Sequence, residues 1–146
     1  MKRIFLLIAV LAFSGCSHID VQHYGTMDLS DKTMTVPPGT KWLIGELKKS
    51  LISSGWELLI YDGASNTSGT AGAMVELKHT KAFNARYRLV VTATWYNQCM
   101  DYTNAVSFDL SVIDNNKGKE VFTMLGNGCE SDIVEAFNNA LLSKPK

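Results

Sequence analysis

The sequence contains no concentration of positive charge. Its 14 Lys and Arg residues are balanced by 14 Asp and Glu residues, and nowhere do more than two basic residues stand side by side. Proteins that bind nucleic acid neutralise several phosphates with clustered Lys and Arg side chains. The sequence therefore gives no support for a nucleic-acid partner.

Long apolar runs are also scarce, and the one that stands out lies at residues 4–13. Ten residues are too few to span a bilayer as a helix. Lys2 and Arg3 precede the run, and Ser14 and Gly15 follow it. A basic start, a short apolar run and small residues before a cleavage point are typical of a secretory signal peptide. The pattern predicts a signal peptide over residues 1–15; an uncleaved anchor and a buried N-terminal helix are the alternatives.

The end of this leader carries a more specific pattern. Phe13-Ser14-Gly15-Cys16 resembles the lipobox of bacterial lipoproteins, in which cleavage falls before the Cys and fatty acids such as palmitate are attached to it. Lipoboxes usually begin with Leu, Ala or Val, so Phe13 departs from the pattern and puts the rate of processing in doubt. Ser17 stands where an Asp would retain the protein in the inner membrane. The resemblance implies a lipid on Cys16 and a place on the periplasmic side of the outer membrane of a Gram-negative bacterium.

The remainder of the chain has the size of one domain. Removing residues 1–15 takes away Lys2 and Arg3 and leaves 12 basic against 14 acidic residues. About 130 residues suit a single core. Residues 17–30 show neither helical nor alternating periodicity, so we expect residues 16–30 to be the lipidated Cys and a flexible tether, with a root-mean-square span of roughly 20 Å. The domain itself is expected over residues 31–146.

Cysteine is rare, and its scarcity makes the pairing simple. Of three cysteines, assigning Cys16 to the lipid leaves Cys99 and Cys129. In the oxidising periplasm such a pair is usually a disulfide. The bridge would close a loop of about thirty residues and stabilise the fold by about 3 to 4 kcal/mol. A metal pair or a redox dithiol is the alternative, but the sequence has no Cys-x-x-Cys spacing and no His close to either Cys.

Hydrophobic periodicity predicts an α+β fold. Apolar residues at helical spacing predict one amphipathic helix from an N-cap at Thr40 to Gly55 and a second that starts at Glu130 or Ser131. Residues 64–73 have the composition of a flexible loop, and the Gly126-Asn127-Gly128 segment is expected to end the last strand. Strands are expected at residues 32–36, 56–61, 74–80, 86–96, 106–112 and 120–125. The predicted order is β-α-β-β-β-β-β-α, a two-layer sandwich with a mainly antiparallel sheet of five or six strands and both helices on one face.

Alternation within residues 86–96 separates an apolar from a polar face. The polar face is a candidate partner-binding surface, because Arg and Tyr side chains are frequent anchors of interfaces; an ordinary solvated face is the alternative. Its residues are Arg86, Arg88, Thr92, Thr94 and Tyr96. The strand pattern of residues 87–95 and 108–114, with the hairpin that follows, also resembles small accessory lipoproteins of proteobacteria. That resemblance covers about sixty residues and implies a similar sheet and a role in the cell envelope.

Signs of catalysis are missing from the sequence. There is no Gly-x-Ser-x-Gly motif, and Asp109 and Asp114 fall on a polar strand face and in a turn rather than forming a carboxylate pair. His18 and His23 lie in the expected tether without ligand-type neighbours, and His79 closes an expected strand. We therefore expect no enzymatic activity, no cofactor and no metal.

These features favour an interaction module over an enzyme. The leading hypothesis is an outer-membrane lipoprotein that binds or places another envelope protein, in the manner of a secretin pilotin or of an activator of a peptidoglycan synthase. A domain that binds a small ligand or an inhibitor is the alternative, and a closed apolar cavity between sheet and helices would favour it. An envelope hydrolase is the third hypothesis.

Overall fold

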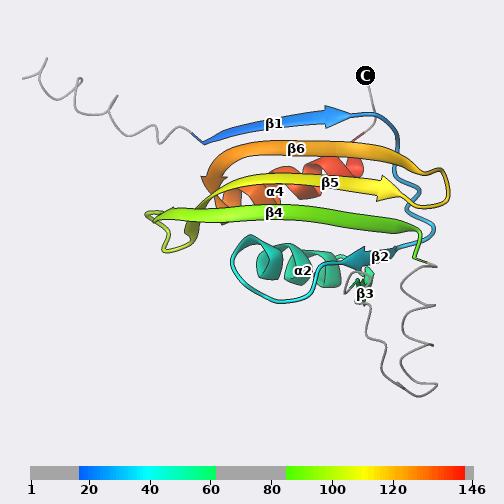
Figure 1. Cartoon of the computed structure of the whole chain (residues 1–146), viewed down its shortest axis with the longest axis horizontal. Coiled ribbons are helices and arrows are strands. Elements are labelled where there is room, and N and C mark those ends of the chain that lie inside the picture. Colours follow the sequence, from blue (N-terminus) through cyan, green and yellow to red (C-terminus); the bar gives the residue numbers. More distant parts are fainter. Residues whose placement is uncertain (1–16, 62–84, 144–146) are drawn as a thin grey trace, which may run out of the picture.

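The computed structural model describes residues 17–61 and 85–143 of the chain. They form one sheet and two helices (Figure 1). The predicted loop at residues 64–73, the predicted strand at residues 74–80, His79 and Cys16 lie outside the described residues. The elements are β1 (His18–His23), β2 (Thr33–Val36), α2 (Leu43–Ser53), β3 (Glu57–Ile60), β4 (Tyr87–Gln98), β5 (Asn104–Asp114), β6 (Lys119–Cys129) and α4 (Glu130–Leu142).

The sheet has six strands and is mixed. Its order is β1-β6-β5-β4-β2-β3. The pairs from β1 to β4 are antiparallel, whereas β2 lies parallel to both β4 and β3. The α+β class and the two helices are thus confirmed, but the prediction of a mainly antiparallel sheet is wrong. The reason is that α2 connects β2 to β3, and a helical crossover brings the chain back to run in the same direction.

The order of elements also differs from the prediction. Two strands, β1 and β2, precede the first helix, where the sequence predicts one. The additional strand is β1, which lies inside the segment expected to be a flexible tether. His18–His23 pair antiparallel with β6 along their whole length, from His18 opposite Asn127 to His23 opposite Phe122. The tether prediction is therefore wrong for these residues, which belong to the sheet.

The glycine segment of β6 explains why β1 can bind there. The sequence predicts that Gly126 and Gly128 end the strand, but β6 continues to Cys129. Gly126 has φ 148° and lies opposite Ile19, and a Cβ atom there would collide with the carbonyl oxygen of His18. A Cβ on Gly128 would lie 3.1 Å from the Cβ of Ser17. The glycines thus permit a close approach of β1 instead of ending the strand.

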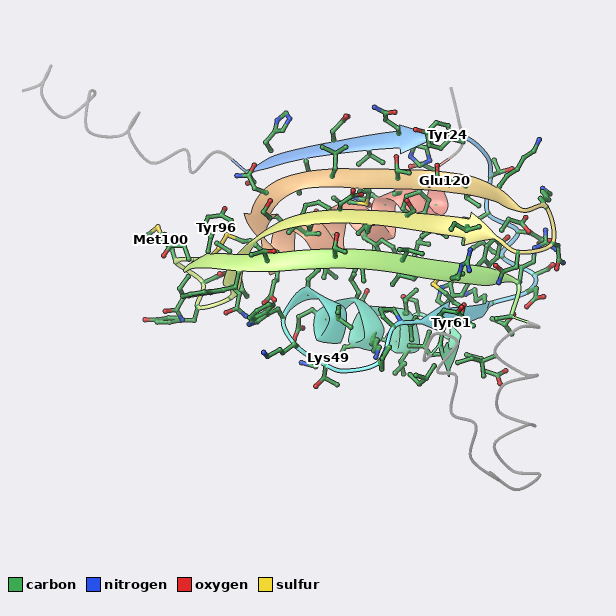
Figure 2. All side chains as sticks on the ribbon, viewed as in Figure 1. Tyr24, Lys49, Tyr61, Tyr96, Met100 and Glu120 are labelled. Carbon is green, nitrogen blue, oxygen red and sulfur yellow. A yellow bond between two sulfur atoms is a disulfide. The ribbon has the colours of Figure 1, made fainter. Side chains whose placement is uncertain are left out.

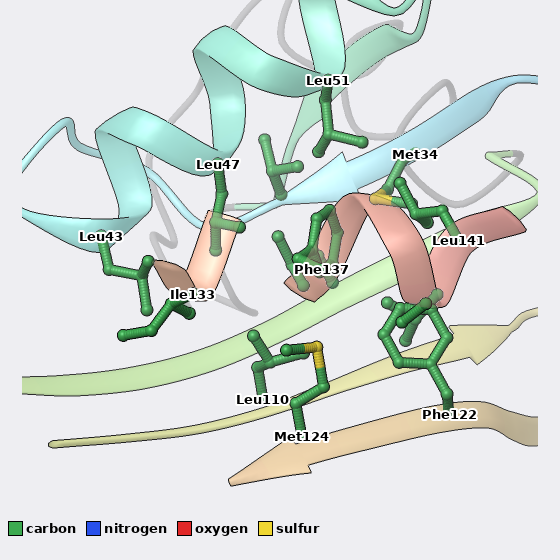
Figure 3. Close-up of a cluster of buried hydrophobic side chains, with 14 of the residues drawn as sticks. Met34, Leu43, Leu47, Leu51, Leu110, Phe122, Met124, Ile133, Phe137 and Leu141 are labelled. Carbon is green, nitrogen blue, oxygen red and sulfur yellow. The ribbon is translucent and has the colours of Figure 1, made fainter. Parts of the chain in front are cut away.

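The core lies between the sheet and both helices. Leu43, Leu47 and Leu51 of α2 and Ile133 and Phe137 of α4 join one buried cluster with the apolar side chains of the strands (Figure 3). The Phe122 ring of β6 lies 5.8 Å from that of Phe137, and Ser50 of α2 donates a hydrogen bond to Asn138 of α4. Both helices therefore cover the same face of the sheet, and their apolar side chains belong to the same buried cluster as those of the strands.

The first helix begins later than its predicted cap. Trp42, at φ 50°, precedes α2, and no side chain caps the helix. Within residues 17–61 and 85–143, neither helix is long and apolar enough to cross a membrane.

Candidate interaction surfaces

The face of the sheet opposite the helices carries the candidate binding strip. Residues that lie directly opposite one another on antiparallel strands point to the same face. Thr92 lies opposite Asp109, Asp109 opposite Leu125, and Leu125 opposite Asp20, so these four residues form one row across β4, β5, β6 and β1. All four are exposed. We call this surface the open face.

Arg86 does not belong to the open face. Its guanidinium lies 3.1 Å from the carboxylate of Asp114, which is almost fully buried at the far end of β5. The Arg86 backbone N–H donates to the Thr33 hydroxyl, and the guanidinium lies over the Tyr87 ring. Burial alone would lower the pKa of Arg86, but the hydrogen bond and the charge of Asp114 raise it above its usual value. Arg86 is therefore held in an internal ion pair, which the sequence does not predict.

The other residues of the predicted strip divide between two places. Arg88 is half-buried beside Thr35 of β2. Thr92 and Thr94 are exposed on the open face, and Tyr96 lies in the bulge where β4 shifts its register against β5. Of the five predicted residues, the structure thus brings Thr92 and Thr94 together, with Tyr96 toward the hairpin and the two Arg residues at the other end.

The turn between β4 and β5 forms an apolar tip that the sequence analysis misses. Met100 is 90% exposed and Tyr102 is 86% exposed, and Trp95 and Tyr96 are about half exposed. We call residues 95–103 the hairpin tip. The sequence does carry one signal of this tip, four large apolar side chains close to a cysteine. The alternation within residues 86–96, however, predicts that Trp95 points to the buried face. It fails here because the end of β4 extends beyond the packed core.

Three links fasten the hairpin tip and the adjoining first residue of β5, Asn104, to the start of α4. Cys99 and Cys129, the predicted pair, are joined by a disulfide. The carboxylate of Glu130 accepts hydrogen bonds from the backbone and side-chain N–H groups of Asn104. Asp101 accepts hydrogen bonds from the hydroxyls of Thr103 and Ser131, and these bonds lower the pKa of Asp101. The tip is consequently held in a fixed position.

The same group of side chains has the spacing of a metal site but not its chemistry. A carboxylate oxygen of Asp101 and the sulfurs of Cys99 and Cys129 lie within 4.8 Å of one another. A thiolate is the form of Cys that binds a metal. Because both sulfurs are engaged in the disulfide, the group offers a single carboxylate.

The described histidines occupy structural positions. His18 is exposed on the edge strand β1. The His23 ring packs 5.7 Å from the ring of Phe122. Within residues 17–61 and 85–143, neither histidine is hydrogen-bonded to the side chain of a Ser, Thr or Cys.

Comparison with known proteins shows similarity in fold. The sequence matches no protein-family model and no curated protein at a significant level. Two structures of PelC dodecamers from Paraburkholderia phytofirmans, one of them a point variant, each have a TM-score of 0.53 and 14% identity, covering 88% and 90% of this chain and 100% of the PelC chain. Lipoprotein GNA1162 from Neisseria meningitidis has a TM-score of 0.34 and 17% identity, and the alignment covers 75% of this chain and 93% of the GNA1162 chain. A TM-score of 0.34 does not establish a shared fold. The chain thus resembles PelC in fold.

Proposed function

We propose that the chain is a lipid-anchored protein of the outer membrane, facing the periplasm, that acts without catalysis as an accessory to another envelope component. The observation that carries this proposal is the combination of the lipobox-like leader with a sheet whose open face is not covered by any described element. An exposed, rigid, four-stranded surface is suited to binding a protein partner.

The position of β1 narrows where such a partner would act. Because β1 starts at His18, only Ser17 separates the sheet from Cys16. The Ser17 hydroxyl donates a hydrogen bond to Asp132 of α4, which ties even this residue to the domain. A lipid on Cys16 would therefore keep the folded domain at the membrane surface. This favours a pilotin-like role at the outer membrane over an activator that must reach across the peptidoglycan.

The first experiment tests the anchor. Cells that express the chain are labelled with palmitate, and wild type is compared with Cys16→Ser. We expect label in wild type, its loss in the variant, and wild type in the outer-membrane fraction of a density gradient. Unlabelled wild-type protein would contradict the proposal.

The second experiment tests the open face. A photo-crosslinking amino acid is introduced in living cells at Thr92 or Leu125 on the open face, and at Asn139 on α4 as a control on the covered side. We expect one dominant protein adduct from the open face and none from α4. Its mass identifies the partner: a second copy, which the PelC dodecamers make worth testing, or another protein. Equal yields from both sides would contradict a partner on the open face.

A further inference from the structure

The hairpin tip lies at the same end of the sheet as the start of β1, the strand that follows the proposed lipidation site. β1 starts where β6 ends, because the two strands are antiparallel and His18 lies opposite Asn127. Figure 2 shows Tyr96 and Met100 at this end and Tyr24, just after β1, at the other. With strands about 4.8 Å apart, the start of β1 and the β4–β5 turn are separated sideways by roughly 10 to 15 Å.

Two consecutive residues of α4 hold these two parts together. The hydroxyl of Ser131 donates a hydrogen bond to Asp101 in the hairpin tip, at 2.8 Å. The carboxylate of the next residue, Asp132, accepts one from Ser17, at 3.2 Å. The alpha carbon of Cys16 is about 3.8 Å from that of Ser17 through their peptide bond. The first turn of α4 therefore holds both the tip and Ser17, the residue that follows the proposed lipidation site.

The tip has the composition of a membrane-interface anchor. Trp and Tyr side chains are enriched where headgroups meet acyl chains, because each combines an apolar ring with a polar group. Met100 and Tyr102 are almost completely exposed, and Trp95 and Tyr96 of the same segment are about half exposed; exposed apolar side chains gathered in one place mark an interaction site. Asp101 is the only charged residue of residues 95–103, and its carboxylate is already hydrogen-bonded inside the tip.

We propose that the hairpin tip inserts Met100 and Tyr102 into the interface of the membrane in which Cys16 is lipidated, as a second, protein-made contact beside the acyl chains. This inference rests on the proposed lipidation. A single acyl chain gives only marginal binding and additional contacts strengthen attachment, but the effect of the tip is chiefly on orientation. Two contacts on one end of the molecule stand the sheet upright, with the open face turned sideways along the membrane.

The test uses a matched pair of variants, Tyr102→Trp in the tip and Tyr24→Trp at the opposite end. Tyr24 is likewise exposed, and its hydroxyl donates a hydrogen bond to the side chain of Gln22, which is also exposed. Full-length lipidated protein is reconstituted into vesicles of phosphatidylethanolamine and phosphatidylglycerol that contain a bromine-labelled phospholipid. The fluorescence that each new Trp adds to that of the native Trp residues is compared with and without bromine.

We expect bromine to quench at least half of the fluorescence added by Tyr102→Trp and almost none of that added by Tyr24→Trp. Adding Met100→Asp to the Tyr102→Trp protein should reduce its quenching at least twofold. Because the tip has no basic side chain, 0.5 M salt should leave the quenching unchanged. Equal quenching of both variants would mean that the domain lies on its side, and it would overturn the proposal. Quenching of neither variant would also overturn it, and would be expected if the tip binds a protein instead.

Mass spectrometry of the same preparation distinguishes a failure of the proposed lipidation from a failure of the proposed membrane contact of the tip. A protein without acyl groups on Cys16 contradicts the proposed function before the tip is tested. An acylated protein whose Tyr102→Trp fluorescence is not quenched leaves the anchor intact and contradicts the membrane contact of the tip alone. Both positions are exposed, and Tyr102 has φ 66°, so its backbone already carries a large aromatic residue in this conformation.

Discussion

At the scale of single residues, Gly126 and Arg86 are each constrained by a contact that a single substitution would remove or block. At Gly126 an added Cβ would collide with the backbone of the edge strand β1, and its φ of 148° is one that residues with side chains rarely adopt. Arg86 neutralises Asp114, a carboxylate that is almost fully removed from water. Neither constraint is visible from residue type alone.

Gly126→Ala should destabilise the protein by about 2 kcal/mol or more. The substitution adds backbone strain and also a collision with His18, so β1 has to move away from β6. Urea unfolding measures the change. Gly118→Ala is the matched control, because Gly118 also has positive φ, 62°, but open space around it, and it should cost only about 1 kcal/mol. Equal losses would show that β1 is not held tightly against Gly126.

Arg86→Met should lower the free energy of unfolding by about 2 kcal/mol. After the substitution the buried Asp114 carboxylate still accepts its two backbone hydrogen bonds and still has Lys117 at 3.8 Å. We therefore expect a smaller loss than the roughly 3 to 5 kcal/mol that follows when a buried charge is left without any partner. Lys49→Met, which breaks the exposed Lys49–Glu46 pair, should cost less than about 0.5 kcal/mol. A similar loss in both variants, measured by urea unfolding, would contradict the structural role of Arg86.

At the scale of elements, the β4–β5 hairpin depends on contacts outside itself. Its turn extends beyond the packed core, and it is held by the disulfide, by Glu130 and by Asp101. All three links end at residues 129–131, where β6 passes into α4. The position of the hairpin tip is thus decided by the start of a helix that is distant in sequence.

Replacing both Cys99 and Cys129 by Ala should lower the free energy of unfolding by about 3 to 4 kcal/mol, because the closed loop spans 30 residues. Thermal unfolding with and without a reductant supplies the control. Wild type in reductant should unfold at nearly the temperature of the double variant, and the variant should not respond to reductant. An unchanged midpoint in the double variant would mean that the bridge adds nothing to stability.

At the scale of the whole molecule, the decisive feature is that a single residue, Ser17, separates the sheet from Cys16, the proposed site of lipidation. A flexible tether would let the domain explore a range of heights above the membrane, whereas a strand that starts at His18 holds it in place. The proposed partner must then lie close to the membrane surface, beside the open face.

Inserting twenty Gly and Ser residues between Cys16 and Ser17 should release the domain without unfolding it. Such a spacer spans roughly 25 Å, and it leaves Ser17 and β1 in the chain. We expect an unchanged melting temperature, wild-type fractionation with the membrane, and a severalfold lower yield of the open-face photo-crosslink from Thr92. An unchanged yield would show that height above the membrane does not matter for the partner.

The sequence by itself determined the features that depend on local pattern. The strand predicted at residues 106–112 lies within β5, and helical spacing identifies both helices. The Cys99–Cys129 pair follows from counting cysteines and agrees with the disulfide of the structure. Such features follow from the sequence because each depends on neighbouring residues or on a single possible pairing.

Only the tertiary structure decided the roles of residues whose partners are distant in the chain. Residues 18–23 alternate over only six positions, with Ile19 and Val21 against the core, and the prediction of a tether overlooks this short pattern. Gly126 and Gly128, about a hundred residues later, let their backbone approach β6. Arg86 is not part of the open face because its guanidinium pairs with the carboxylate of Asp114 at the end of β5. The apolar tip stays exposed because α4 fastens it beyond the packed core. The physical reason is the same in each case: backbone hydrogen bonds, ion pairs and close glycine contacts form between surfaces that folding brings together, and local propensity does not encode them.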